Sequence, residues 1–92
     1  MLAIRFVGLI LCPMPTIVRQ AGFRVMVHSS DHPPAHVHCY RGKKLIKVSL
    51  SNFAILYREH ASDKDVKTAV AITRQHRDRL LKAWRVIHGE DK

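Results

Sequence analysis

Hydrophobic and polar positions alternate along residues 17–50, and beyond residue 50 the spacing of apolar residues lengthens toward that of a helix. A proline-rich turn at 29–34 and a Gly-containing connection at 41–44 divide the alternating region. Three strands are predicted, at 23–27, 35–40 and 45–50. The short connections between them favour an antiparallel meander.

Two helices are predicted after the third strand. A Ser-Asn pair is suited to cap a short helix over residues 51–57. A longer helix is predicted to begin at Ser62, whose spacing from Asp65 has the S-x-x-D form of an N-terminal cap, and to end at Gly89. The expected fold class is α+β: a three-stranded antiparallel meander packed against a long C-terminal helix, with a short helix between.

The length of 92 residues indicates one small domain. Met14 is followed by a plausible domain start, so residues 1–13 are interpreted as an N-terminal extension, with an added edge strand as the alternative. The domain is then a single α+β unit over residues 14–92. The apolar run at 6–12 is too short to span a bilayer, and no membrane partner is expected.

The two cysteines, Cys12 and Cys39, provide neither a disulfide framework nor the spacing of a C-x-x-C motif. A chain with so few cysteines and no disulfide framework is more typical of a reducing, cytoplasmic compartment. Cys39 alternates with polar neighbours in the second predicted strand, so we interpret it as a small apolar core residue.

Charge constrains the partner more than the fold. The sequence has 16 Lys and Arg against 7 Asp and Glu, which gives a formal net charge of +9. An anionic partner is therefore expected, with nucleic acid as the first choice and an acidic protein or anionic lipid as the next.

Strand alternation predicts which side chains share the sheet face that the long helix leaves uncovered. Positions that face the helix are apolar, as at Phe23, Val37 and Ile46. The opposite face collects histidines, cations and a tyrosine, with no carboxylate among them. Its predicted members are Arg24, Met26, His28, His36, His38, Tyr40, Leu45, Lys47 and Ser49.

This selection suits phosphodiester chemistry, because imidazoles act as general acid and base near neutral pH while cations stabilise a pentacoordinate phosphate. The candidate catalytic residues are His36, His38 and His32. The candidate nucleic-acid-binding residues are Arg24, His28, Tyr40 and Lys47. The tyrosine ring can stack on an unpaired base, and the chemistry requires no metal and no other cofactor.

Other interpretations stay open for the same residues. A basic, His-rich sheet surface can bind RNA, DNA or a partner protein without catalysis. Imidazoles on alternate residues of a strand project in one direction, so His32, His36 and His38 with Asp31 are also candidate metal ligands. Asp31 has a structural alternative as well, in which its side chain holds the proline turn.

Three segments carry a family likeness: Met14-Pro15-Thr16-Ile17, Asp31-His32-Pro33-Pro34-Ala35-His36-Val37-His38 and Leu80-Leu81-Lys82-Ala83-Trp84. With them the chain resembles a family of small prokaryotic proteins known only as a domain of unknown function (4160). Members begin M-P-T-I, carry a D-H-x-P-P-H-x-H signature and close with L-L-x-x-W. The corresponding signature residues are Asp31, His32, Pro34, His36 and His38. The chain departs from the pattern at Ala35, where a second Pro is usual, and at Cys39, where an aliphatic residue is usual.

The resemblance implies a cytoplasmic component of a toxin-antitoxin pair, because some family members are regarded as toxins and are encoded beside a small partner protein. We therefore hypothesise a toxin-like protein that acts on RNA as a small His-dependent ribonuclease. Its expected partners are RNA and a small antitoxin-like protein. The alternative is a non-catalytic basic module that binds nucleic acid or an acidic partner protein.

Overall fold

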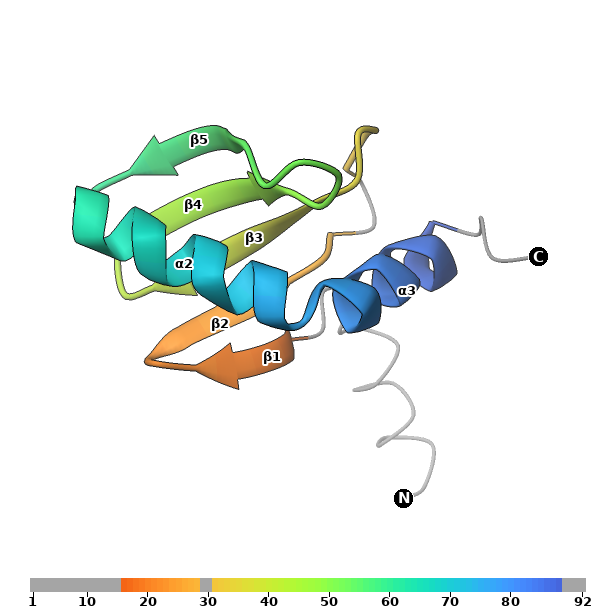
Figure 1. Cartoon of the computed structure of the whole chain (residues 1–92), viewed down its shortest axis with the longest axis horizontal. Coiled ribbons are helices and arrows are strands. Elements are labelled where there is room, and N and C mark those ends of the chain that lie inside the picture. The colour runs from red at the N-terminus through yellow and green to blue at the C-terminus, as the bar shows by residue number, and fades with distance from the viewer. Residues whose placement is uncertain (1–15, 29–30, 89–92) are drawn as a thin grey trace, which may run out of the picture.

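Five antiparallel strands form one sheet in the computed structural model, which describes residues 16–28 and 31–88. The strands lie in sequence order, so each one pairs with its neighbours along the chain (Figure 1). They are β1 (Thr16–Gln20), β2 (Phe23–Met26), β3 (His36–Arg41), β4 (Lys44–Ser49) and β5 (Ile55–Glu59). Two helices follow, α2 (Asp63–Gln75) and α3 (Arg77–Ile87). The fold is α+β, but the predicted number of three strands and the predicted single long helix are wrong. The predicted extension, residues 1–13, lies outside the described residues.

The strand β1 was missed by the sequence analysis and lies at one edge of the sheet. It pairs with β2 across a tight turn at Ala21 and Gly22, whose φ angles are 53° and 81°. Positive φ at both central residues is what a type I′ hairpin turn requires, and glycine adopts it without steric cost. Alanine is not a typical residue for this position, so the sequence carried only half of the usual hairpin signal.

The segment predicted as a short helix over residues 51–57 forms a turn and an edge strand instead. The backbone N–H of Phe53 donates to the carbonyl of Ser49, and Asn52 Oδ1 accepts from the N–H of Ala54 at 3.0 Å. The chain then returns alongside β4 as β5, all of whose residues are exposed. Apolar residues at 53, 55 and 56 fit helical and strand spacing equally well, and hydrogen bonding to the free edge of β4 decides between them.

The predicted long helix is interrupted at His76, where φ is −112° and ψ is 22°. His76 Nε2 donates to Gln20 Oε1 at 2.9 Å, and Gln20 Nε2 donates to Gln75 Oε1 at 3.0 Å. These contacts tie the interruption to β1, the strand that the sequence analysis had not identified. The helical spacing of apolar residues continues across the break, so this spacing predicts one helix rather than two.

Helix α2 lies across one face of the sheet and covers the apolar core (Figure 1). Val25 and Ile46 from the sheet and Ile72 from α2 are buried there. The prediction that Cys39 is a core residue is confirmed: it is fully buried, and burial raises the pKa of its thiol to about 11. Each large apolar side chain buried in this way contributes roughly 1.5–3 kcal/mol to stability.

The predicted N-terminal cap of the helix is confirmed. The Ser62 side chain accepts from the N–H of Asp65, and the Asp65 carboxylate accepts from the N–H of Ser62 at 3.0 Å, which forms a capping box. Lys44 Nζ lies 2.9 Å from the same carboxylate. The backbone N–H of Ser62 and then Lys44 lower the pKa of Asp65 to about 2. The cap therefore also fastens the start of α2 to β4.

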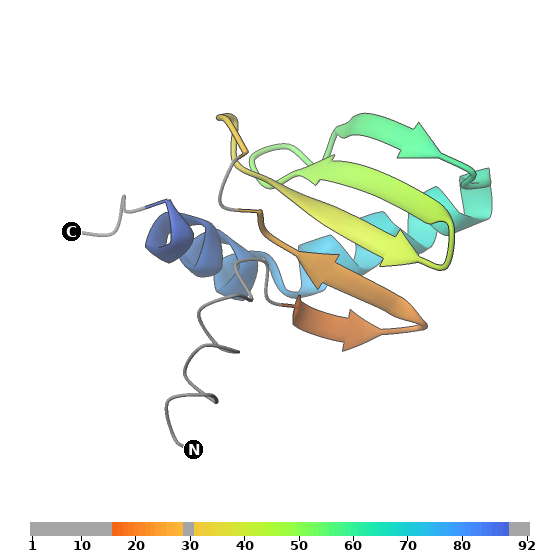
Figure 2. The same cartoon turned by 180° about the vertical axis from the view of Figure 1, so that it is seen from behind.

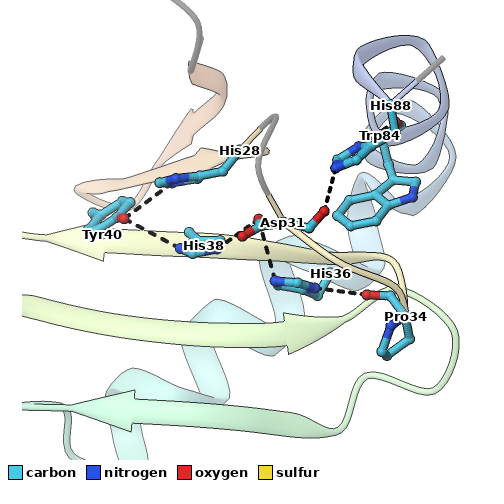
Figure 3. A network of polar contacts seen from close by, with 8 residues as sticks. All are labelled: His28, Asp31, Pro34, His36, His38, Tyr40, Trp84 and His88. Atoms are coloured by element: carbon cyan, nitrogen blue, oxygen red, sulfur yellow. Dashed lines mark hydrogen bonds and ion pairs between the residues drawn. The ribbon is translucent and has the colours of Figure 1, made fainter.

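Most of the opposite face of the sheet is covered by no helix or strand of the described chain (Figure 2). We call it the open face. At one end of it, the described part of the irregular segment between β2 and β3 passes over the face and meets the end of α3 (Figure 3). In the described part of the chain, neither helix is long and apolar enough to cross a membrane.

Candidate functional site

The strand register arranges the side chains of the open face in two rows that cross the sheet. One row consists of Arg19, Arg24, Tyr40, Leu45 and Glu59. The other consists of Met26, His38, Lys47 and Tyr57. His36 pairs with Ser49 beyond the second row. Polar and aromatic groups from all five strands are thereby brought onto one surface.

At one end of this surface Asp31 lies between His36 and His38 (Figure 3). Its Oδ2 is 2.9 Å from His38 Nε2 and 3.4 Å from His36 Nε2. The three side chains are mostly buried, with exposures of 15% for Asp31, 10% for His36 and 7% for His38. Because the two histidines alternate on β3, they point to the same side of the sheet. Together with His28 we call these residues the histidine cluster.

The backbone before β3 fixes the orientation of His36. Its Nδ1 lies 2.8 Å from the carbonyl oxygen of Pro34. A carbonyl oxygen only accepts, so Nδ1 carries the proton that it donates. In the neutral ring, Nε2 then presents a lone pair toward Asp31 Oδ2, which is itself an acceptor.

A directed chain of hydrogen bonds joins the rest of the cluster (Figure 3). Burial, and then the nearby His28, lowers the pKa of His38 to about 4, so its ring is neutral at neutral pH. His38 Nε2 donates to Asp31 Oδ2 at 2.9 Å, which leaves Nδ1 to accept from the hydroxyl of Tyr40 at 3.4 Å. The Tyr40 oxygen in turn accepts from His28 Nε2 at 3.2 Å. Burial also lowers the pKa of His28.

Stacked rings enclose the cluster. The ring of His28 stacks on His38 at a centroid distance of 3.8 Å, and Trp84 of α3 lies 5.4 Å from His36. His88 stacks on Trp84, and its Nε2 donates to the backbone oxygen of Asp31 at 3.1 Å. The end of α3 therefore holds the Asp31 backbone in place, while His38 is stacked on His28 and His36 lies beside the tilted ring of Trp84.

The middle and far end of the open face are different, because cations there are paired with tyrosine rings. The guanidinium carbon of Arg24 lies 5.9 Å from the centre of the Tyr40 ring. Lys47 Nζ lies 5.3 Å from the centre of the Tyr57 ring, which is 46% exposed. Arg24, Tyr40, Lys47 and Tyr57 form what we call the cation-tyrosine patch.

The structure brings most of the sequence-predicted site residues together. His28, His36, His38 and Tyr40 are in contact, and Arg24 and Lys47 flank them on the same face. His32 is exposed and makes none of the cluster's hydrogen bonds. His36 and His38 share a face as the alternation indicates, but they are buried in it and do not project into solvent.

Sequence reasoning missed Tyr57, Glu59 and Arg19 on this face, because the strands that carry them were not predicted. Glu59 also adds a carboxylate to a surface that was expected to have none, and it accepts a hydrogen bond from Tyr57 at 3.1 Å. Residues 55–59 show no alternation of apolar and polar positions, so the sequence carried no clear strand signal there.

Comparison with known proteins gives one match. The profile of the family described as "Domain of unknown function (DUF4160)" matches residues 22–85, which includes β2 to β5, α2 and nearly all of α3. No curated protein and no solved structure matches the chain.

Proposed function

The chain belongs to the DUF4160 family, whose description names no activity, and from the geometry of its open face we propose that it binds single-stranded RNA. The observation that carries this proposal is the cation-tyrosine patch, which lies on the part of the open face that no described helix or strand covers (Figure 2). The net charge of +9 adds long-range attraction for a polyanion.

The patch supplies the two interactions that single strands need. Unpaired bases stack on exposed aromatic rings, and stacking of this kind contributes about 1–3 kcal/mol per base. Tyr57 is exposed for this role, and Tyr40 lies two strands away in the other row of the same face. Arg24 and Lys47 provide positive charge beside each ring for the phosphates between stacked bases. A duplex would keep its bases paired and out of reach of these rings.

Burial favours binding over catalysis as the role of this face. A general acid or base must come within hydrogen-bond reach of the proton that it transfers. The side chains of His36 and His38 are at most 10% exposed, and both are already engaged with Asp31 and their other neighbours. The groups accessible to RNA are instead the cations and tyrosines.

Fluorescence anisotropy with a labelled single-stranded RNA tests the proposal. The logarithm of the binding constant should fall with the logarithm of salt concentration by about 0.7 per neutralised phosphate. The double variant Arg24→Gln/Lys47→Gln should bind more weakly and reduce the salt slope by about 1.4, because two phosphate contacts are lost.

The matched control is Lys67→Gln on α2, which removes an exposed charge from the other side of the sheet. It should leave both affinity and salt slope close to those of the wild-type protein. Equal weakening by Lys67→Gln and by Lys47→Gln alone would indicate a response to net charge and would contradict binding at the patch.

The family resemblance adds two hypotheses, which can be tested with the same protein and the same labelled RNA. A ribonuclease that uses His36, His38 or His32 would shorten the labelled RNA over time, and a His36→Ala/His38→Ala variant would not. An acidic antitoxin-like partner that neutralises the protein would compete with RNA for the cationic patch. Competition measured by anisotropy with the product of a neighbouring gene would detect such a partner.

A further inference from the structure

Three potential ligand atoms converge at the buried end of the open face. They are one carboxylate oxygen of Asp31 and one ring nitrogen each from His36 and His38, and all lie within 4.8 Å of one another. His36 and His38 come from alternate positions of one strand, and Asp31 comes from the segment that passes over them (Figure 3). The backbone bond from His88 to Asp31 holds that segment to α3.

A backbone hydrogen bond fixes which ring nitrogen of His36 faces Asp31. His36 Nδ1 donates to the carbonyl oxygen of Pro34, which leaves its Nε2 directed toward the carboxylate oxygen of Asp31 at 3.4 Å. A positive charge between these two atoms stabilises the contact, whether it is a proton on Nε2 or a metal ion. A backbone hydrogen bond on the other ring nitrogen is also the arrangement by which proteins commonly orient a metal-binding histidine.

We propose that Asp31, His36 and His38 bind a divalent transition-metal ion of the zinc class, through Oδ2 of the aspartate and Nε2 of each histidine. Two imidazoles and one carboxylate suit first-row ions such as Zn²⁺, whereas Mg²⁺ and Ca²⁺ prefer oxygen ligands. Three protein ligands leave a fourth position for water, as in zinc sites that remain open to other ligands.

The distances require only a modest contraction of the cluster. Ligand bonds of about 2.0–2.1 Å in tetrahedral zinc place neighbouring ligand atoms roughly 3.3 Å apart. The two contacts of Asp31, at 2.9 and 3.4 Å, already bracket this separation. The ion would draw the ring nitrogens together from their present limit of 4.8 Å.

The surrounding hydrogen bonds accommodate the ion without new partners. With a metal on Nε2, the proton of His38 resides on Nδ1 and is donated to Tyr40, whose hydroxyl then donates to His28. The contacts of the Tyr40 hydroxyl with His38 at 3.4 Å and with His28 at 3.2 Å are therefore kept in the metal-free and the metal-bound protein, with donor and acceptor exchanged. Tyr40 is therefore a positioning residue for His38.

The proposal is tested with the full chain after treatment with a chelator, without RNA, so that its outcome is independent of the proposed function. Titration with Zn²⁺ by calorimetry should show one ion bound per chain. Saturation at about 100 times Kd should raise the Tm by roughly 10–20 °C for a domain of this size. Substitution with Co²⁺ should give the visible absorption of a low-coordinate site without a thiolate charge-transfer band, which excludes ligation by cysteine.

Variants then assign the ligands. His36→Ala and Asp31→Ala should each weaken Zn²⁺ binding at least 100-fold, and apo melting curves show whether each variant is folded. Tyr40→Phe keeps all three ligands and should weaken binding about 10-fold, the usual effect of removing a hydrogen bond to a metal-binding histidine. His32→Ala is the matched control, since His32 adjoins Asp31 in sequence and is exposed.

Several results would overturn the site. They are the absence of saturable one-to-one binding, a thiolate band with Co²⁺, and a His32→Ala variant that loses as much affinity as His36→Ala. If Tyr40→Phe and His36→Ala both bind Zn²⁺ as tightly as the wild-type protein, the proposed site is also contradicted. This holds even if the Asp31 variant does not fold.

Discussion

At one end of the open face, the side chains of His36 and His38 are 10% and 7% exposed, whereas Tyr57 at the other end is 46% exposed. Both ends are built from alternate residues of neighbouring strands, so the sheet by itself does not explain their different exposure. The difference arises outside the sheet, where the segment with Asp31 and the end of α3 cover only the histidine end.

This comparison shows that position on a strand face does not by itself determine chemistry. Beneath the Asp31 segment, low solvent exposure strengthens the polar contacts of Asp31 with His36 and His38. In the uncovered region, the same face offers rings and charges to a large partner. Substitutions at the covered end should therefore reduce stability more than substitutions at the uncovered end.

The largest effect is expected for Trp84→Ala at the covered end. Trp84 is 2% exposed and packs against His36 and His88, so truncation should lower the free energy of unfolding by about 3–5 kcal/mol. Urea denaturation measures this change. Val86→Ala on the exposed side of α3 is the control, with an expected change within about 0.5 kcal/mol. Equal losses in the two variants would mean that α3 does not seal the cluster.

A smaller loss is expected for Asp31→Ala measured in the presence of a chelator. The substitution leaves the buried Nε2–H of His38 without its acceptor, which costs about 1–3 kcal/mol. Urea denaturation of His32→Ala, whose side chain is exposed, should show a change within about 0.5 kcal/mol. If the two variants are equally stable, Asp31 does not stabilise the buried histidines.

Acid sensitivity should come from a carboxylate on the other side of the sheet. The folded pKa of Asp65 is about 2, below the usual value near 3.8, so its contribution to stability is present above that value and is lost as pH falls toward 2. The stability difference between the wild-type protein and Asp65→Asn should therefore shrink between about pH 5 and pH 2 in urea denaturation. A difference independent of pH would show that the charge of Asp65 has no part in its effect.

The smallest effect on stability is expected for Tyr57→Leu on the exposed edge strand, within about 0.5 kcal/mol. Affinity for single-stranded RNA should nevertheless fall roughly 5- to 150-fold, because one stacking ring is lost. Leu56→Ala is the matched control, since Leu56 precedes Tyr57 in β5, is equally exposed and carries no aromatic ring. Anisotropy that shows the same affinity for Tyr57→Leu and wild-type protein would contradict base stacking at this position.

Elements with one dominant local signal could be predicted from the sequence. The alternation that defines β2, β3 and β4 and the Ser62–Asp65 cap agree with the structure. The predictions were wrong for elements whose secondary structure depends on contacts with residues distant in the sequence. Residues 55–59 pair as a strand with the edge of β4, and the helix is interrupted at His76, where Gln20 of a distant strand makes a hydrogen bond.

For the candidate site, alternation correctly grouped His36 and His38 with Tyr40 and Lys47 on one face. It could not indicate burial, because the covering groups come from Asp31 and from Trp84, far along the chain. It could not indicate the tautomer of His36 either, which depends on the carbonyl of Pro34 folding back onto the ring. Spacing thus identifies candidate ligands, whereas their protons are set by tertiary contacts.

The sequential order of the five strands has a consequence for how the protein is made. Each hairpin joins segments that are adjacent in the chain, so a strand leaving the ribosome finds its partner already synthesised. Such local pairing keeps the entropy cost of loop closure small and favours rapid folding. The two helices are synthesised last, and their arrival completes the core and closes the histidine end of the sheet.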